Sequence, residues 1–299
     1  MHIPVMLNEV IESLEIKQNG IYVDLTLGRA GHSKKILNNI KDGKLIGFDK
    51  DIIAIEESRS RLQKINNNFI LIHSDFKNFK NELKKYGINK VDGIIADLGV
   101  SSPQIDNANR GFSYNKNGFL DMRMDQSQSL KAWNIVNEWN VDELINIFIN
   151  YADVKMPKKI ANAIVKNRPI NTTFELVDVI KSSLPAKIVS LKNPAKTVFQ
   201  AIRIAVNNEF ESIDIILRDS IEFLKKDGIL AIITFHSLED KIVKNFFGDL
   251  TKSKINPKIP VQEEKKFVVK TLKPSKNEIE FNKRSRSAKL RILKKIKED

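Results

Sequence analysis

Four short apolar runs in the first third of the chain share one pattern. Each is closed by a glycine or a polar residue, and stretches with helical spacing lie between them. The runs are Ile21–Leu27, Leu45–Phe48, Phe69–His73 and Val91–Ala96. The helical stretches are Ser33–Asn39, Ile52–Ile65 and Phe79–Tyr86. Strands that alternate with helices in this way form a parallel sheet, and nearly continuous apolar strands indicate helices on both faces. The sequence therefore predicts a Rossmann-like α/β fold.

The alternation stops after Asp97 and resumes near residue 197. The intervening pattern is helical, at Leu130–Ala152, Lys158–Lys166 and Phe174–Ser183. A helix at Gln200–Lys225, a strand at Gly228–Phe235 and a helix at Glu239–Phe247 then continue the α/β pattern, before strand-like pieces at Lys266–Leu272 and Ala288–Ile292. We expect residues 1–105 and 197–299 to form one discontinuous domain. Residues 106–196 are expected to form a mostly helical insertion.

The ends of the four predicted strands indicate a cofactor site, because open parallel sheets bind ligands outside their carboxyl ends. The turn Gly28–Gly31 lets backbone N–H groups approach a ligand carboxylate just before a helix. Asp49 closes the second strand, where an acid can hold ribose hydroxyls. Phe76 offers a ring to pack on adenine, and Asp97 closes the fourth strand beside the expected position of a methyl group. Each residue taken alone also fits an ordinary turn or helix cap.

A dinucleotide is the competing cofactor, since an acid after the second strand serves both kinds of ligand. Dinucleotide sites require G-x-G-x-x-G so that the backbone can touch a pyrophosphate. Here Ala30 and Ser33 occupy the second and third glycine positions. A nucleoside sulfonium such as S-adenosylmethionine carries no phosphates and needs less room, so the pattern favours it over NAD.

Two segments carry residues suited to a nucleic-acid substrate. Arg110-Gly-Phe112-Ser-Tyr114 interleaves aromatic rings with arginine, which is typical of stacking on an unpaired base. Phe112 equally suits a simpler role, pinning a long loop to the core. Leu120–Asp125 alternates charge with methionine, and its Arg123 could line a substrate groove. In Phe235–Asp240 we expect Ser237 to cap a helix, while His236 faces the same cleft as Asp97.

The net charge of the chain also favours a nucleic-acid partner. The chain has 50 basic and 37 acidic residues, a net charge of +13, and 16 of the basic residues but only 6 acids fall between Thr251 and Asp299. A phosphate backbone is the natural partner for such a field. Arg284, Arg286 and Arg291 are the candidate contacts, although the same segment also fits a solvated strand at the edge of the sheet.

Several classes of protein are disfavoured. Cysteine is absent, so disulfides and thiolate metal sites are excluded, and the four histidines lack metal-ligand spacing, so we expect no metal. The nucleophile elbow G-x-S-x-G of serine hydrolases is also absent. No apolar run reaches the roughly 18 residues that span a bilayer, and the N-terminus lacks a signal-peptide pattern. We expect a cytoplasmic protein without a membrane partner.

At these residues the chain resembles the bacterial RsmH (MraW) family of 16S ribosomal RNA methyltransferases. The most specific matches are DLGVSSPQ from Asp97, LDMRMD from Leu120 and FHSLED from Phe235, in that order. Further matching segments are His2–Glu9, Tyr22–Gly28, Gly31–Ser33, Arg110–Ser113, Phe199–Ile204, Val206–Asn207 and Asn282–Arg291. The resemblance therefore covers nearly the whole chain.

The resemblance implies methylation of the exocyclic N4 of cytidine 1402 in 16S ribosomal RNA of the small ribosomal subunit, on a class-I methyltransferase sheet with a helical insertion. It implies S-adenosylmethionine as cofactor and leaves open whether the chain forms a homodimer. The implied cofactor residues are Ala30, Gly31, His32, Asp49, Phe76, Asp97 and Gln104. Ala30 departs from the glycine usual in the family. A non-catalytic RNA-binding factor for ribosome assembly is the alternative, which the intact cofactor acids disfavour.

Cytosine N4 is a poor nucleophile because its lone pair is delocalised into the ring. An acceptor that takes a hydrogen bond from N4–H localises that pair as the methyl group is attacked. Asp97 is the candidate acceptor, with Ser101 or Ser102 assisting. If Asp97 instead holds the cofactor amine, a serine or a backbone carbonyl must take that role.

Overall fold

The structure is a computed structural model that describes residues 4–252 and 264–298. The chain folds into two compact units, Met1–Gly99 with Glu211–Asp299, and Val100–Phe210. The boundaries expected from the sequence fall after residue 105 and before residue 197. The difference at the second boundary arises because helix α11 (Ala195–Asn207), which was expected to join the sheet domain, packs into the core of the helical unit.

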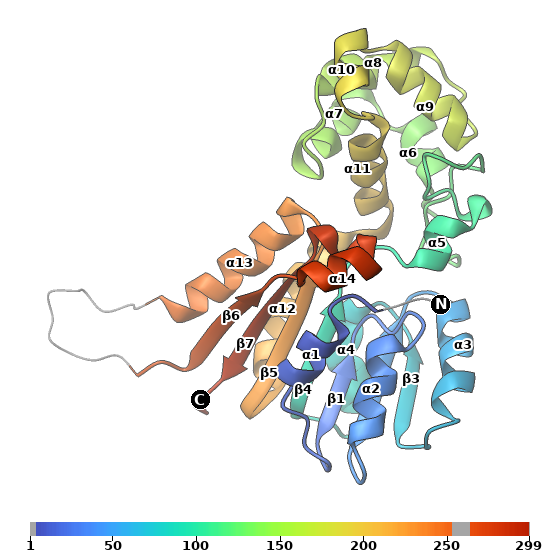
Figure 1. Cartoon of the computed structure of the whole chain (residues 1–299). Helices are drawn as coiled ribbons and strands as arrows, with labels where there is room; N and C mark the ends of the chain where they lie inside the picture. The colour runs from blue at the N-terminus through green and yellow to red at the C-terminus, as the bar shows by residue number, and fades with distance from the viewer. Residues whose placement is uncertain (1–3, 253–263, 299) are drawn as a thin grey trace, which may run out of the picture. The chain divides into compact units, whose positions relative to one another are not determined.

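The first unit is built on a seven-stranded sheet of order β3-β2-β1-β4-β5-β7-β6 (Figure 1). Its strands are β1 (Ile21–Asp24), β2 (Lys44–Asp49), β3 (Phe69–His73), β4 (Val91–Asp97), β5 (Leu224–Thr234), β6 (Phe267–Leu272) and β7 (Lys289–Lys295). The first five are parallel, and β7 pairs antiparallel with both β5 and β6. The predicted α/β fold is confirmed, and the two strand-like pieces of the tail form the antiparallel edge.

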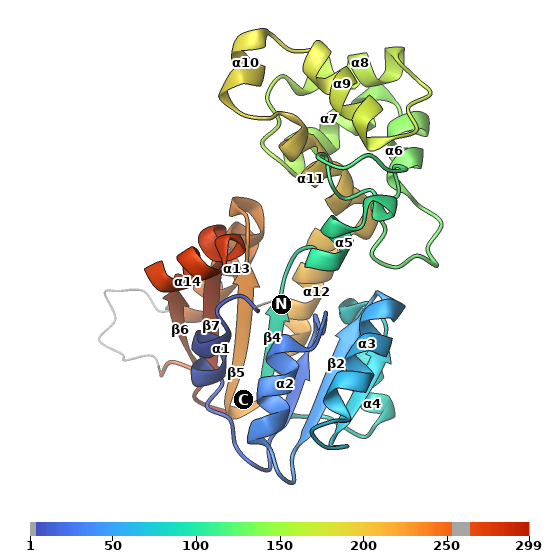
Figure 2. The same cartoon turned by 45° about the vertical axis from the view of Figure 1, so that its right-hand side comes forward.

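Helices cover both faces of this sheet, as the continuous apolar strands require. Figure 2 shows α1 (Leu7–Ser13) and α2 (Gly31–Asn39) in front of the strands. On the other face, α4 (Phe79–Lys85) meets α12 (Glu209–Phe223) through an edge-on contact between the Phe79 and Phe223 rings, with centroids 5.5 Å apart. The remaining helices of the unit are α3 (Ile52–Leu62), α13 (Ser237–Thr251), α14 (Lys276–Phe281) and the 3-10 turns η1 (Phe76–Asn78) and η3 (Lys283–Ser287).

The second unit is helical and has its own apolar core. Its helices are α5 (Ser102–Asp106), the 3-10 turn η2 (Ala108–Arg110), α6 (Ala132–Glu138), α7 (Val141–Asn150), α8 (Pro157–Lys166), α9 (Thr173–Ser182), α10 (Ala186–Leu191) and α11. The helical stretch predicted over Leu130–Ala152 is split, because Asn140 caps α7 by accepting from Glu143 N at 2.9 Å.

Three sequence-based expectations about elements were wrong in detail. The predicted helix Gln200–Lys225 is two helices, because Asn208 between them adopts the left-handed conformation with φ 52°. Strand β5 begins at Leu224, earlier than the predicted Gly228. Helix α13 is capped by His236 rather than Ser237, with Glu239 in the capping box. Helices α1, α5, α10 and α14 were not predicted. No helix in the described residues is long and apolar enough to cross a membrane.

Gly111 provides a test of the helical unit. Its φ is +69°, and an added Cβ would overlap Phe119 O and lie 2.7 Å from Asp121 N. Gly87 has a similar φ of +70° with nothing within 4 Å, so it isolates the conformational cost. We expect Gly87→Ala to lower the free energy of unfolding by about 1 kcal/mol and Gly111→Ala by several kcal/mol. Chemical denaturation measures both, and equal losses would contradict the close packing at Gly111.

Candidate cofactor and substrate sites

The turn between β1 and α2 is fixed by hydrogen bonds to neighbouring elements. Gly28 adopts φ 49°, and its N–H donates to Asp49 Oδ2 at 2.8 Å. The Gly28 carbonyl oxygen accepts from Ser58 Oγ at 2.9 Å. At the start of the turn, buried Asp24 accepts from Ser33 Oγ at 2.7 Å, which ties the end of β1 to α2. The turn is therefore held in one conformation before any ligand arrives.

The three predicted residues that follow form the start of α2. Ala30 is buried and takes the left-handed conformation, φ 58°, which glycine adopts at lower cost. Gly31 is required sterically, because an added Cβ would overlap the Pro4 ring. The His32 ring lies beneath the N-terminal segment, with Nε2 3.0 Å from Val5 O. The N-terminal segment thus packs directly against the turn.

Asp49 ends β2, next to this turn. Its two carboxylate oxygens accept from the backbone N–H groups of Gly28, at 2.8 Å, and Asp51, at 2.9 Å. Burial raises the pKa of Asp49 to about 6, against the opposing effect of these two hydrogen bonds. Each oxygen retains a second lone pair that can accept from a hydroxyl. The geometry suits the predicted contact with ribose hydroxyls.

Phe76 and Asp75 lie at the end of β3, where the sequence predicted an adenine contact. Lys50 Nζ is 2.8 Å from Asp75 Oδ2 and 5.5 Å from the centroid of the Phe76 ring. The Asp75 carboxylate is therefore paired with a cation. The Phe76 ring is partly exposed and suits packing on an adenine.

Asp97 ends β4 and has the least satisfied carboxyl group in this region. Its Oδ1 is buried and has no hydrogen-bond partner, while its backbone N–H donates to Thr26 Oγ1 at 2.6 Å. Burial raises the pKa of Asp97 to about 8, and the nearby carboxylates of Asp24 and Glu239 add to the shift. A buried acceptor without a donor is costly unless a ligand supplies one. An amine or ammonium group satisfies this requirement.

His236 follows β5, which is the strand beside β4, and caps α13. Its Nδ1 lies 3.4 Å from Glu239 N and its Nε2 lies 2.9 Å from Glu239 Oε1. Glu239 is fully buried, and its Oε2 accepts from the backbone N–H groups of Phe235 and His236. The sequence placed His236 near this edge but did not identify Glu239. Asp24 was missed as well, although a carboxylate within the apolar run IYVDLTL was a signal for a buried polar role.

Ser101, Ser102 and Gln104 belong to the helical unit, at the start of α5. The Ser101 N–H donates to Gln104 Oε1 at 3.0 Å in a capping box. Ser102 and Gln104 are both buried. The capping box accounts for Ser101 and Gln104 structurally, and leaves their predicted roles in catalysis and cofactor binding as proposals.

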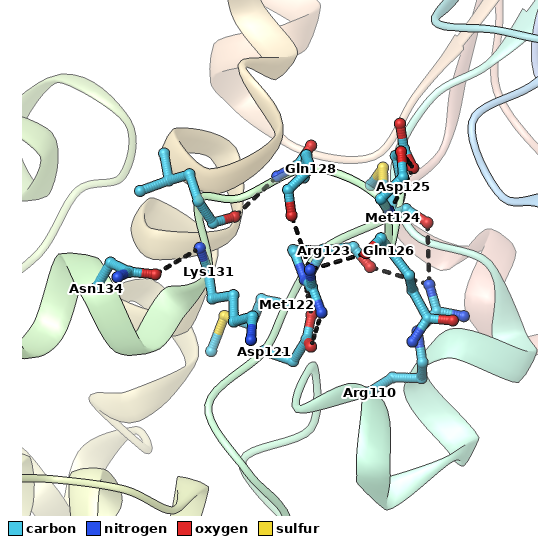
Figure 3. Close-up of polar contacts among 12 residues, drawn as sticks. Arg110, Asp121, Met122, Arg123, Met124, Asp125, Gln126, Gln128, Lys131 and Asn134 are labelled. Carbon is cyan, nitrogen blue, oxygen red and sulfur yellow. Dashed lines mark hydrogen bonds and ion pairs between the residues drawn. The ribbon is translucent and has the colours of Figure 1, made fainter.

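The arginines of the predicted substrate loop are used within the loop itself (Figure 3). Buried Arg110 donates from Nη2 to the carbonyl oxygens of Arg123, at 2.9 Å, and Met124, at 3.0 Å. Arg123 forms a two-pronged ion pair with Asp121, at 2.9 and 2.8 Å, and donates to two further loop carbonyls. These guanidinium groups hold the shape of the LDMRMD segment, and direct contact with phosphate would require breaking these bonds.

The two aromatic residues of the RGFSY segment differ in exposure. Phe112 is buried in the core of the helical unit, which matches the simpler interpretation of a loop anchor. Tyr114 is half-buried and packs edge-on against Phe199, with ring centroids 6.0 Å apart. Tyr114 therefore remains the better candidate for stacking on a base.

The three tail arginines also separate into two groups. Arg291, on β7, donates from Nε to Asp240 Oδ1 at 2.6 Å, and Lys289 Nζ lies 2.6 Å from Oδ2 of the same carboxylate. Burial opposes ionisation of Asp240, but these two cations outweigh it and lower its pKa. Arg284 and Arg286 lie exposed on η3. Arg291 thus stabilises the join between α13 and β7, and the exposed pair is better placed for RNA.

Comparison with known proteins decides the family. A sequence model of the MraW methylase family matches residues 1–296. The chain belongs to this family. The methylase is 63% identical over 295 residues to ribosomal RNA small subunit methyltransferase H of Mycoplasmopsis agalactiae, covering 99% of this chain and 98% of that protein. Its identity to the protein of the same name from Mycoplasmopsis synoviae is 59%, covering 99% of both chains.

The resemblance seen in the sequence is therefore confirmed, and the fold is the expected class-I methyltransferase sheet with a mostly helical insertion. An rRNA methylase from Streptococcus thermophilus has a TM-score of 0.44 and 13% identity, covering 99% of this chain and 100% of that chain. Family membership also sets aside the NAD-linked alternative for this methylase.

The raised pKa of Asp97 predicts a specific pH dependence of stability. An unfolded aspartate titrates near pH 4, so between about pH 4 and pH 8 the folded state keeps a proton that the unfolded state has lost. Raising the pH through this window destabilises the unliganded wild type by at most about 1.4 kcal/mol per pH unit. Asp97→Asn should therefore be more stable than wild type, by an amount that grows with pH.

Urea denaturation across this pH range measures the effect. Asp240→Asn is the matched control with the opposite sign, because its lowered pKa contributes stability that is present at neutral pH and lost as the pH falls. If Asp97→Asn and wild type show parallel pH profiles, the Asp97 carboxyl is solvated in the free protein.

Proposed function

We propose that this methylase transfers the methyl group of S-adenosylmethionine to the exocyclic N4 of one cytidine, cytidine 1402, in 16S ribosomal RNA of the small subunit. Family membership and the names of its relatives support ribosomal RNA methylation. The observation that carries the chemistry is Asp97, whose buried Oδ1 lacks a hydrogen-bond donor at the carboxyl end of β4. An amine is the kind of group that such an acceptor binds.

The cofactor is S-adenosylmethionine, and the residues of the first unit fit it. The fixed turn from Gly28 to His32 presents the start of α2 to the cofactor's carboxylate. Asp49 has lone pairs for the ribose hydroxyls, and Phe76 offers a partly exposed ring for adenine. Gln104 completes the proposed set from the helical unit. When bound, the cofactor supplies an electrophilic methyl group.

In the proposed mechanism Asp97 acts as the base for the target amine. In its ionised form, which becomes the main form as the pH rises past about 8, the Asp97 carboxylate accepts a hydrogen bond from N4–H, which localises the nitrogen lone pair, and then takes the proton that N4 must lose. A base is most effective when its pKa lies near the working pH, and the raised pKa of about 8 meets this condition. Ser101 and Ser102 follow Asp97 closely in the chain and are proposed to assist as hydrogen-bond partners of the base.

The RNA contacts are proposed from exposure and charge. Tyr114 stacks on a base, while Arg110, Phe112 and Arg123 shape the loop that receives it. Arg284 and Arg286 contact the phosphate backbone, and His236 lies near the target. The helical unit serves as the substrate-recognition domain, and the small ribosomal subunit in the cytoplasm is the partner.

The function is tested with labelled S-adenosylmethionine and purified small subunits. Wild type should label the ribosomal RNA at N4 of a single cytidine. Asp97→Asn should reduce the single-turnover rate at saturating cofactor by roughly 100-fold or more, because the base is lost. Asp42→Asn, a change at an exposed acid before β2, at the amino end of the strand, is the control and should react at the wild-type rate.

Two results would contradict this proposal in different ways. Tight binding of RNA by wild type without any labelling would favour the non-catalytic assembly factor. Equal turnover of Asp97→Asn and wild type would remove Asp97 from the chemistry and assign it to cofactor binding.

The form of the substrate gives a separate prediction. Within the described residues the exposed cations lie on both units, so we expect recognition of a shaped particle rather than of a short sequence. Methylation of naked 16S RNA, assembly intermediates and mature subunits, measured side by side, should be fastest on an assembled particle. Equal rates on naked RNA would overturn this expectation.

A further inference from the structure

Phe281 is the most exposed large apolar side chain among the described residues, at 82%. It ends α14, and the turn η3 that follows carries three exposed cations, Lys283, Arg284 and Arg286. Single exposed apolar residues are common on proteins, so exposure alone assigns no role. Here the exposed ring adjoins a cluster of positive charge in residues 276–287, which we call the α14–η3 corner.

The sheet places this corner at the edge where the proposed chemistry occurs. Lys289, two residues after η3, pairs with Thr234, the last residue of parallel strand β5. Asp240 near the start of α13 then joins Lys289 and Arg291 through bonds of 2.6 Å. Both views show α14 at the end of the sheet toward which β4 and β5 point (Figure 1, Figure 2). Asp97 and His236 lie at this same edge of the first unit.

Hydrogen bonds on both sides of Phe281 hold the backbone of the corner in place, and the Phe281 ring remains exposed to solvent. Ser275 caps α14 by accepting from Glu278 N at 3.1 Å, and Glu278 Oε1 accepts from Met6 N at 3.2 Å. Ser285 is fully buried, and its Oγ donates to Asn282 O at 2.8 Å. These contacts fix the segments on either side of Phe281 and leave its ring exposed.

We propose that the α14–η3 corner binds an unpaired nucleotide of the RNA substrate, with its base stacked on Phe281 and its neighbouring phosphates at Arg284 and Arg286. An exposed ring beside cations is the arrangement that binds single strands, because every base has a face for stacking and phosphates need positive charge. The inference rests on the proposed function and adds a second contact on the RNA, separate from the target cytidine. The positive charge of the corner favours RNA over an apolar protein partner.

The test measures binding of a fluorescent single-stranded RNA of roughly 10 nucleotides at several salt concentrations. Phe281→Ala should weaken binding by roughly 5- to 150-fold with an unchanged salt slope, because it removes stacking and no charge. Phe281→Trp should retain binding. Arg284→Gln with Arg286→Gln should lower the salt slope by about 1 for each phosphate that is no longer neutralised.

Two matched controls separate the corner from general surface effects. Tyr86→Ala removes another exposed aromatic side chain, at 51%, between α4 and β4, and Lys41→Gln removes an exposed cation before β2. Both positions lie at the amino ends of the parallel strands, away from the edge that carries Asp97. Both variants should bind RNA as wild type does. The proposal is overturned if Phe281→Ala binds RNA with wild-type affinity. It is also overturned if Phe281→Trp loses as much RNA affinity as Phe281→Ala does.

The outcome is independent of methyl transfer, because binding is measured without cofactor. Wild type that binds RNA through Phe281 but labels no cytidine would refute the proposed function and leave this surface in place. Unchanged RNA binding together with altered self-association or ribosomal-protein binding in Phe281→Ala would assign the ring to a protein contact and overturn the RNA proposal.

Discussion

The placement of carboxylates at the carboxyl ends of β1, β2 and β4 is the constraint on which the site depends. The carboxylate oxygens of Asp24 and Asp49 accept hydrogen bonds from Ser33 and from backbone N–H groups of the turns, and these bonds make the edge rigid. Asp97 has no such donor for Oδ1. Two acids therefore build the edge, and the third keeps a buried oxygen that a hydrogen-bond donor of a ligand can satisfy. The raised pKa of Asp97 expresses the free energy stored in this arrangement.

The sequence predicted the sheet well because each strand is a short apolar run with a distinct end. Phe69–His73 matches β3 residue for residue, and the tail strands were placed within a few residues. The errors occurred where backbone conformation, rather than hydrophobic pattern, sets the boundary. Asn208 interrupts a continuous helical pattern through a left-handed φ, which nothing in its neighbours' periodicity reveals.

The candidate site was only partly predictable, for a different reason. Motifs identify which residues matter, but not which partner each side chain takes. Arg110, Arg123 and Arg291 were predicted as RNA contacts from local motifs and tail charge, and the structure gives each a close acceptor within the protein. Glu239 could not be singled out, because its contacts with the His236 ring and with the backbone N–H groups of Phe235 and His236 depend on a cap position shifted by one residue. Phe281 was missed because a single aromatic residue in a basic segment forms no motif or periodic pattern that would predict its exposure.

The insertion of the helical unit between β4 and β5 has a consequence for folding. These two strands are direct neighbours in the sheet, yet the whole unit Val100–Phe210 separates them in the chain. Closing a disordered loop costs entropy that grows with its length, by about 0.6 kcal/mol for each doubling. The helical unit has its own core, so it can fold first and shorten the effective loop. Pairing of β4 with β5 would then follow the folding of the helices. Mutations that slow the folding of the helical core would also delay formation of the sheet edge that carries Asp97.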